Sequence, residues 1–330
     1  MRLLMLGGTE FVGRAVTEAA LARGWEVTVF HRGHHAAPEG ARAVHGDRTA
    51  DGGLSALAEG EWDVVVDTWS AAPRVVRESA RLLAGRAGRY VYVSSGSVYA
   101  YPGAAGSDEG FPVVDGDPDA EATAYAQDKR GGELAALDGF GAGRTVLARA
   151  GLILGPYENI GRLPWWLNRV ARGGPVLAPG PRDLHIQYID VRDLAEWILD
   201  AGAAGLQGAY NLVSPMGRTT MGELLDACLE VAGAPDASLR WTDPQVVLGA
   251  GIEQWMELPV WLAPGELHDT MHRTSSEKAV AAGLRSRPVA ETVRDTWEWL
   301  RSIGGSAPQR PDRPVVGLAP EKEAKALGLA

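Results

Sequence analysis

Short apolar runs alternate with longer amphipathic stretches through the first two thirds of the 330-residue chain. The runs of strand length are "RLLMLG", "WEVTVF", "ARAVHGD", "DVVVDTW", "RYVYVSS" and "RTVLARAGLILG". Between most of them, apolar residues recur at helical spacing, as over 11–23, 72–86 and 120–138. Strands that alternate with helices predict βαβ units, and therefore a parallel sheet covered by helices on both faces.

The pattern loosens after about residue 155, where Gly and Pro clusters separate the helical stretches. Helices are expected near 160–172, 192–204, 219–232 and 288–303. We predict one domain over 1–155, with 180–215 returning to it, and a smaller α/β lobe that takes up most of 156–330. This division suits the length, because single cores stop growing near ~250–300 residues. The tail "GGSAPQRPDRPVVG" is predicted to be an extended linker before a last short helix at about 320–327.

Charge and cysteine content narrow the class of protein. Lys and Arg total 32 against 42 Asp and Glu, and the net charge of −10 repels nucleic-acid phosphates, so no nucleic-acid partner is expected. The single cysteine, Cys228, has no intrachain disulfide partner and is interpreted as a core residue. No apolar run approaches the ~18–20 residues of a membrane span. We therefore expect a cytoplasmic protein without a membrane partner.

The first strand leads into a glycine-rich turn, "GGTEFVG", and then into a helix. This arrangement places backbone N–H groups and the positive end of the helix where a pyrophosphate can bind. The predicted cofactor-binding residues of the turn are Gly7, Thr9, Glu10, Phe11, Val12 and Gly13. Glu10 occupies the position of the usual middle glycine. Its carboxylate either bonds ribose hydroxyls, which would favour NAD, or pairs with Arg32 or Arg14.

The end of the second strand bears on the choice between NAD and NADP. Proteins that bind NAD usually carry an acidic residue there, whereas this chain has His31 and Arg32. Because an arginine can pair with a 2′-phosphate, Arg32 favours NADP(H), and Glu10 keeps NAD(H) open. Asp47, in "HGDR", is placed either to accept a hydrogen bond from the adenine amino group or to form a turn.

A tyrosine and a lysine share one face of the helical stretch 120–138. Tyr125 and Lys129, in "YAQDK", lie four positions apart in the sequence. An ammonium group beside a phenol favours the phenolate and so lowers the tyrosine pKa from ~10 toward that of a general acid/base. Upstream, the buried strand of "YVYVSSGSVYAYP" ends in Ser94, Ser95 and Ser97, whose hydroxyls are expected beside that tyrosine.

The motifs "GGTEFVG", "SSGSVY", "YAQDK", "LILGP" and "YIDVRDLAEW" follow one another in a known order. By these motifs and their order, the chain resembles the extended short-chain dehydrogenase/reductases, also called the NAD(P)-dependent epimerase/dehydratase superfamily. The resemblance covers nearly the whole chain. The resemblance implies a Rossmann doubly wound parallel sheet with a smaller C-terminal substrate lobe. It also implies that Tyr125 is the catalytic acid/base, that Lys129 binds the cofactor ribose and that Ser95 orients the substrate, with Ser97 assisting.

The turn and "HRG" most resemble an atypical branch of that superfamily, which includes bacterial members of undetermined substrate and plastid RNA-associated relatives. Its 4,6-dehydratases carry an acidic pair where this chain has Gly96 and Ser97, so water elimination is not favoured. Asp67, Thr68 and Trp69, at the end of "VVVDTW", are expected near the nicotinamide half of the cofactor, with Thr68 contacting the cofactor and Trp69 either lining the substrate pocket or packing in the core.

Other substrate contacts are expected from the second lobe. The candidates are Arg162, Trp165 and Gln187, although tryptophans at helical spacing also suit a core. His268 and His272 have the spacing of a metal pair, but no third ligand or HExxH pattern accompanies them, so no metal is expected.

Three functions are compatible with these residues. The first is an NADP(H)-dependent oxidoreductase that acts on a carbonyl or secondary alcohol, with Tyr125 transferring the proton. The second is a sugar or nucleotide-sugar epimerase that uses the same tyrosine. The third, an RNA-associated or regulatory protein, is disfavoured by the negative charge and by the intact Ser95, Tyr125 and Lys129 set. In the first two readings the partner is a small-molecule substrate, and a homodimer remains open.

Overall fold

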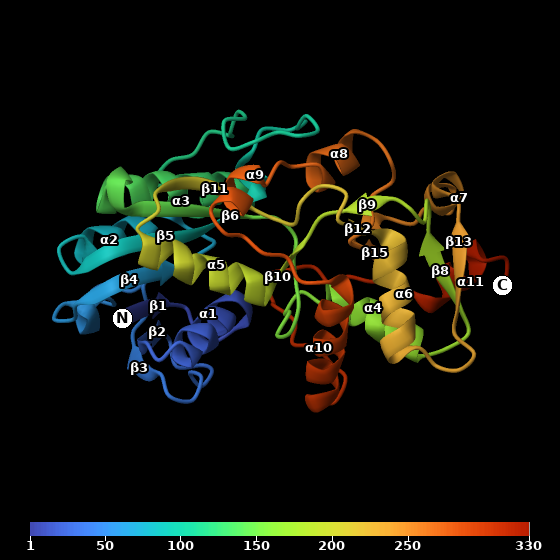
Figure 1. Cartoon of the computed structure of the whole chain (residues 1–330), viewed down its shortest axis with the longest axis horizontal. Coiled ribbons are helices and arrows are strands. Elements are labelled where there is room, and N and C mark those ends of the chain that lie inside the picture. Colours follow the sequence, from blue (N-terminus) through green and yellow to red (C-terminus); the bar gives the residue numbers. More distant parts are fainter. Residues whose placement is uncertain (330) are drawn as a thin grey trace.

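The computed structural model describes residues 1–329 and contains a seven-stranded parallel sheet (Figure 1). The strand order is β11-β6-β5-β4-β1-β2-β3. The strands are β1 (Arg2–Leu6), β2 (Glu26–His31), β3 (Arg42–His45), β4 (Trp62–Asp67), β5 (Ala87–Ser95), β6 (Thr145–Ala150) and β11 (Gly208–Leu212). The order reverses next to β1, as in doubly wound sheets. The predicted α/β Rossmann architecture is therefore confirmed.

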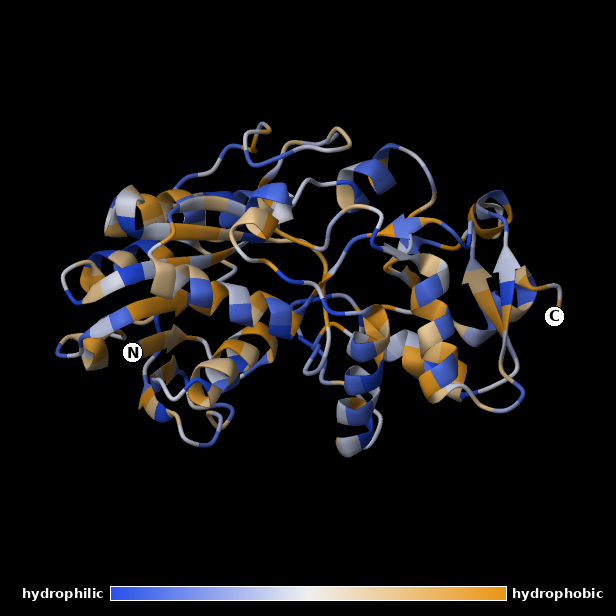
Figure 2. Ribbon diagram, in the orientation of Figure 1, coloured by the Kyte–Doolittle hydropathy of each residue, from blue (hydrophilic) through white to orange (hydrophobic). Residues whose placement is uncertain are grey.

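Helices cover both faces of this sheet. Helices α1 (Phe11–Ala22) and α5 (Val191–Ala204) lie on one face, and α2 (Pro73–Leu83) and α3 (Tyr125–Phe140) lie on the other. Alternate residues of each strand serve alternate faces: on β1, Leu3 and Met5 pack toward α1, and Leu4 and Leu6 pack toward α2. Apolar side chains make up most of both cores, which explains why the strands read as hydrophobic runs, largely orange in Figure 2.

The run 144–155, read as one strand, is divided in the structure. After β6, Gly151 donates its N–H to the carbonyl of Leu212, and the chain leaves the sheet as β7 (Ile153–Leu154), which pairs with β10 (Ile189–Asp190). A Cβ at position 151 would lie 2.9 Å from Val213, so glycine permits the close passage. This turn directs residues 155–161 away from the sheet and into the second lobe.

The second lobe has its own apolar core, which includes Trp166, Trp261 and Cys228. Its main elements are α4 (Arg162–Ala171), α6 (Met221–Ala232), α10 (Val289–Ser302), α11 (Pro320–Ala326) and the parallel pair β8 (Pro175–Pro179) and β13 (Ser238–Thr242). Its shorter elements are β9 (His185–Ile186), β12 (Thr219–Thr220), α7 (Pro244–Gly249), β14 (Gln254–Trp255), β15 (Leu258–Pro259) and α8 (Glu266–His272). Helix α9 (Glu277–Ala281) packs against β11 instead. A domain boundary at residue 155 stays a prediction.

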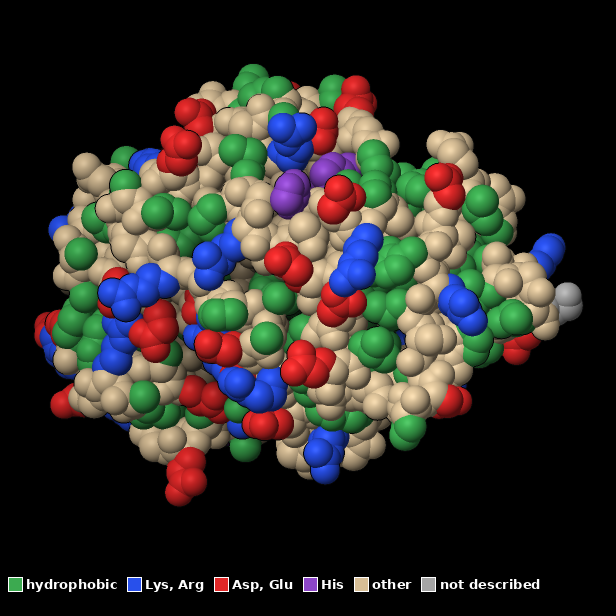
Figure 3. Space-filling model, turned by 45° about the vertical axis from the view of Figure 1, so that its right-hand side comes forward, with side chains coloured by type: hydrophobic (Ala, Val, Ile, Leu, Met, Phe, Trp, Pro, Cys, Tyr) green, Lys and Arg blue, Asp and Glu red, His purple; other side chains and the backbone are tan. Residues whose placement is uncertain are grey.

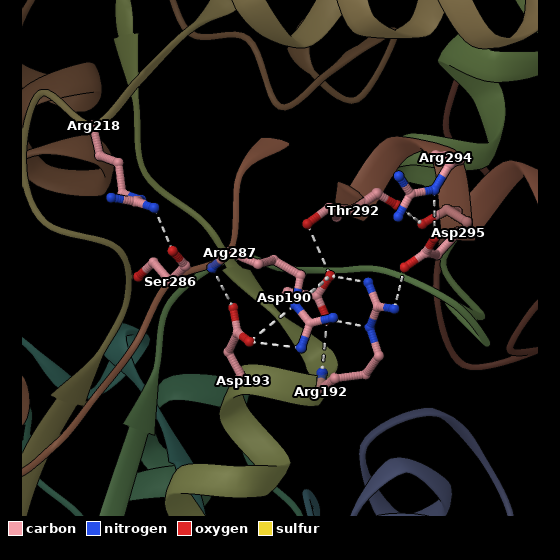
Figure 4. A network of polar contacts seen from close by, with 10 residues as sticks. Asp190, Arg192, Asp193, Arg218, Ser286, Arg287, Thr292, Arg294 and Asp295 are labelled. Carbon is pink, nitrogen blue, oxygen red and sulfur yellow. Dashed lines mark hydrogen bonds and ion pairs between the residues drawn. The ribbon is translucent and has the colours of Figure 1, made fainter. Parts of the chain in front are cut away.

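Charged residues join the sheet to the second lobe (Figure 4). Asp190 caps the N-terminus of α5 and accepts hydrogen bonds from Arg192 and from the Thr292 hydroxyl, which lies 2.8 Å away on α10. Arg192 also pairs with Asp295 on α10. Arg287 pairs with Asp193 at 2.8 Å. These charge-assisted bonds explain why "YIDVRDLAEW" is rich in acidic and basic residues at the start of a helix.

The surface agrees with the charge balance of the sequence. On the face shown in Figure 3, acidic and basic side chains are interspersed, and no broad basic area is present. Among residues 1–329, no helix combines the length and the apolar character needed to cross a membrane.

Candidate functional site

The predicted site residues gather at the carboxyl edge of the parallel sheet. Gly7 follows β1, Thr68 and Trp69 follow β4, and Ser95 ends β5. Tyr125 is the first residue of α3, which packs beside β5. Ligands of open α/β sheets bind at this edge, where the strand order reverses.

The glycine-rich turn has the geometry of an anion site. Gly7 has φ +91°, and a Cβ at Gly13 would lie only 2.1 Å from the carbonyl oxygen of Gly7. Only glycine therefore lets α1 approach β1 this closely. Helix α1 begins at Phe11 with no side-chain cap and no acidic residue in its first turn. Its first N–H groups are thus left to bind a pyrophosphate, and the residues present fit a dinucleotide.

Glu10 makes a contact that the sequence did not indicate. Its half-exposed carboxylate lies 3.3 Å from Nε2 of His35. It pairs with neither arginine considered for it, because Arg14 bonds to Glu18 at 2.8 Å and stacks on Tyr157, and Arg32 lies exposed in the loop after β2. The carboxylate of Glu10 is thus at the edge of the turn and accessible to a ligand.

Asp47 adopts the turn-forming arrangement. Its Oδ1 accepts hydrogen bonds from the N–H and the hydroxyl of Thr49, at 2.9 and 2.7 Å. These bonds, and more weakly Arg32, hold the pKa of Asp47 below its usual value. A contact between Asp47 and adenine stays a prediction.

Lys129 is buried one helical turn after Tyr125. Its Nζ donates to the carbonyl oxygens of Trp69 and Val93, both at 2.7 Å. Burial lowers the pKa of Lys129 to about 7. The backbone of Trp69 therefore positions the lysine, while its indole Nε1 donates to the carbonyl of Ala72.

Two predicted neighbours of the cofactor face inward. Thr68 donates its hydroxyl to the carbonyl of Leu6 at 3.1 Å, which ties β4 to β1 below the turn. Asp67, expected on the nicotinamide side, is fully buried and is held by Arg48 through two bonds of 2.7 Å and by the Tyr90 hydroxyl at 2.6 Å. Sequence reasoning missed Arg48, although its position in "HGDR" after a strand was a usable signal.

Hydroxyl groups gather at the end of β5. Ser95 accepts a hydrogen bond from the N–H of Ser97 at 3.1 Å, and the two hydroxyl oxygens are 3.2 Å apart. Ser94, by contrast, points away and donates to the buried Glu133. Tyr125 is about one-third exposed, at 36%. Ser95 and Tyr125 thus present polar groups at the sheet edge, and Ser94 belongs to the core.

The second lobe contributes one predicted residue near Tyr125. Arg162 starts α4, and its guanidinium lies 5.5 Å from the centroid of the Trp255 ring. Burial lowers the pKa of Arg162. The carboxyl group of Glu158 and, more weakly, Tyr125 act in the opposite direction. Trp165 packs edge-on against Trp166, with ring centroids 4.7 Å apart.

Gln187 and His272 have structural partners. Gln187 is fully buried, its amide nitrogen donates to the carbonyls of Ser214 and Thr274, and its amide oxygen accepts the Thr274 N–H. His272 accepts the N–H of Gln187 and contacts the carbonyl of Val260, and burial lowers its pKa to about 4. Within the described chain, no cluster of three or more metal-type ligands occurs.

The tail predicted as a linker reaches the site. We define the strap as residues 306–317, between α10 and α11, and its Arg313 lies 4.5 Å from the centroid of the Tyr125 ring. Arg310, also on the strap, influences the pKa of Lys129. The strap contains no helix or strand, and it turns at residues 310–313, where the N–H of Arg313 bonds to the carbonyl of Arg310. Nothing in the local sequence pattern indicates where this segment lies.

Comparisons with known proteins agree with this arrangement. Residues 3–212 match the sequence profile of the NAD dependent epimerase/dehydratase family. No curated protein matches the chain. Solved structures share the fold at low sequence identity.

The UDP-glucose 4-epimerase of Thermus thermophilus in complex with NAD is 23% identical and has a TM-score of 0.63, over 91% of this chain and 99% of that chain. A putative epimerase of Burkholderia cenocepacia is 21% identical with a TM-score of 0.69, over 91% and 98%. The enzyme WbmG of Bordetella bronchiseptica in complex with NAD and UDP is 18% identical with a TM-score of 0.67, over 95% and 99%.

Proposed function

We propose that this chain, which belongs to the NAD dependent epimerase/dehydratase family, is an epimerase that inverts a secondary alcohol carbon of a sugar or nucleotide sugar. The observation that supports the proposal is that Ser95 ends β5, and Lys129 bonds to the ends of β4 and β5, at the same carboxyl edge of the sheet as the dinucleotide-type turn, with Tyr125 one helical turn before Lys129. The neighbours named as UDP-glucose 4-epimerase and putative epimerase support this function more than the net oxidoreductase favoured by the sequence.

Each residue would have a separate task in the proposed reaction. Tyr125 takes the proton from the substrate hydroxyl and later returns it, while the Ser95 hydroxyl holds the substrate oxygen. Lys129 uses two of its three N–H groups on the carbonyls of Trp69 and Val93, so one donor remains for a ribose hydroxyl. Bound NAD supplies the hydride acceptor and, on return, the hydride donor.

The test is to incubate the purified protein with NAD and with UDP-glucose or UDP-galactose, and to separate the nucleotide sugars by chromatography. We expect the opposite epimer to appear without net NADH, because the hydride is returned to the substrate. Stoichiometric growth of absorbance at 340 nm, with an oxidised sugar as product, would instead establish a net oxidoreductase. Other UDP- and dTDP-linked sugars form the remaining arms of the test.

We expect cofactor preference to depend on Glu10, in the turn, and on Arg32, in the loop after β2. We propose that Glu10 accepts hydrogen bonds from ribose hydroxyls of NAD, whereas the exposed Arg32 is available to a 2′-phosphate. Glu10→Gly is expected to weaken NAD binding by roughly 3- to 10-fold and to leave NADP binding unchanged or tighter. Calorimetric titration with both cofactors measures this.

Arg32→Ala is the matched variant, because it should weaken NADP binding and spare NAD. If NAD affinity does not fall in Glu10→Gly, the ribose role of Glu10 is wrong.

A further inference from the structure

The strap is held on the second lobe at both ends. Before it, the Asn168 amide donates to the carbonyl of Gly305 at 2.9 Å. At its other end, Gly317 donates its N–H to the carbonyl of Met256 at 2.8 Å, and Leu318 enters the apolar core. Near its middle, Arg310 donates its N–H to the carbonyl of Asn159, at 3.0 Å, in the segment that leaves β7. The strap is therefore fixed across the site.

Its two arginines have different surroundings. Arg310 forms a two-bond pair with Asp312, at 2.9 and 2.6 Å, which raises its pKa and neutralises its charge. Arg313 lies over the ring of Tyr125, and its nearest carboxylate oxygen, also from Asp312, is 3.9 Å away. Arg313 thus brings a largely uncompensated positive charge to the catalytic tyrosine.

Arg162 approaches the same place from α4. The strap passes directly beside the start of this helix: a Cβ at Gly161 would lie 2.6 Å from the side-chain amide nitrogen of Gln309, and Arg310 bonds to Asn159. The strap therefore brings Arg313 toward the helix end that begins with Arg162, and the positive charge of Arg313 contributes, after burial, to lowering the pKa of Arg162. The carboxyl group of the buried Glu158 lies near Arg162 and raises its pKa, but its two oxygens accept the backbone N–H groups of Arg162 and Leu163, at 2.7 and 3.1 Å, and not those of the guanidinium. Among residues 1–329, the buried Nε atoms of Arg162 and Arg313 have no hydrogen-bond partner.

Buried guanidinium N–H groups without an acceptor are costly, and a bound anion would both accept their hydrogen bonds and offset the positive charge of the two arginines. Planar guanidinium groups recognise the paired oxygens of phosphates and carboxylates.

We propose that Arg313 of the strap and Arg162 of α4 form an oxyanion-binding site beside Tyr125. Resting on the proposed function, this means that the sugar substrate carries a phosphate or carboxylate group near the carbon that reacts. The strap is then a part of the substrate site rather than a linker.

The experiment uses the full-length protein saturated with NAD, so that the turn at α1 is occupied. Inorganic pyrophosphate, UDP and D-glucuronate are titrated in separate calorimetric runs, which distinguishes a phosphate site from a carboxylate site. We expect at least one of them to bind, and Arg313→Gln and Arg162→Gln to weaken that binding roughly tenfold or more. Arg301→Gln, at an exposed arginine of α10, is the control and should not change the affinity.

Equal affinity in the Arg313→Gln variant and the wild type would overturn the inference, and so would the absence of binding at millimolar concentrations of all three probes. Should Arg162→Gln not fold, Arg162→Lys keeps the charge beside Glu158 and removes the planar donor pair. Since binding requires no turnover, anion binding without epimerisation would contradict only the proposed function, and epimerisation with unchanged binding in the variants would contradict only this inference.

Discussion

Replacing Tyr125 by Phe is expected to lower kcat of epimerisation by roughly 10²- to 10⁴-fold, the usual contribution of a positioned general acid/base. The substitution removes only the hydroxyl of a side chain that is already 36% exposed at the start of α3, so the core does not lose a contact. We therefore expect the thermal midpoint and the affinity for NAD to stay close to those of the wild type. Chromatographic measurement of the two epimers gives kcat.

Tyr101→Phe is the matched control, because Tyr101 is 61% exposed and donates its hydroxyl to Glu266 on α8. It should keep wild-type turnover. If Tyr125→Phe retained turnover as well, the proton would have to be carried by another group, and the role assigned to Tyr125 would be wrong.

Local patterns carried most of what the sequence revealed. The strand, turn and helix around Gly7 and Gly13 could be predicted because the closeness of α1 to β1 depends on residues only six apart. The spacing of Tyr125 and Lys129 likewise fixes their relation on one helix. Helix starts were less accurate, since α3 begins at residue 125 rather than 120.

Contacts between distant segments could not be predicted in this way. The strap reaches Tyr125 from a position 188 residues later in the chain, as the numbers of Arg313 and Tyr125 show (313 − 125). Its path depends on hydrogen bonds with Asn168, Asn159 and Met256, and no periodicity in "GGSAPQRPDRPVVG" encodes those partners. Arg313 is for this reason a residue that sequence reasoning missed, whereas Arg162 was among the predicted candidates.

The buried pair of Arg48 and Asp67 is expected to produce the largest change in stability. Burial alone would raise the pKa of Asp67, but Arg48 outweighs this and holds that pKa below its usual value. Arg48→Met would leave a carboxylate without its partner in the core, and we expect it to lower the free energy of unfolding by about 3–5 kcal/mol. Urea unfolding at neutral pH measures the loss.

The charge itself can be tested with a second variant. Arg48→Met combined with Asp67→Leu removes both charges and should recover much of the lost stability, although the Tyr90 hydroxyl and the Trp69 N–H lose an acceptor. As a control, the exposed pair of Arg81 and Asp138, separated by 2.8 Å against 2.7 Å for the buried pair, should contribute less than about 1 kcal/mol. A loss no larger for Arg48→Met than for Arg81→Met would show that the pair is not important for stability.

The same pair predicts a pH dependence of stability. Because the folded-state pKa of Asp67 lies below its unfolded value, its contribution is complete above the unfolded pKa of about 3.9 and is lost as the pH falls through the folded-state pKa. Asp67 also holds the N–H of Trp69, whose carbonyl receives Nζ of Lys129. The difference in the free energy of unfolding between the wild type and Asp67→Asn should therefore be largest at neutral pH and should shrink as the pH falls below about 3.9, which urea unfolding at several pH values measures. The same variant should lower kcat at neutral pH by displacing Lys129.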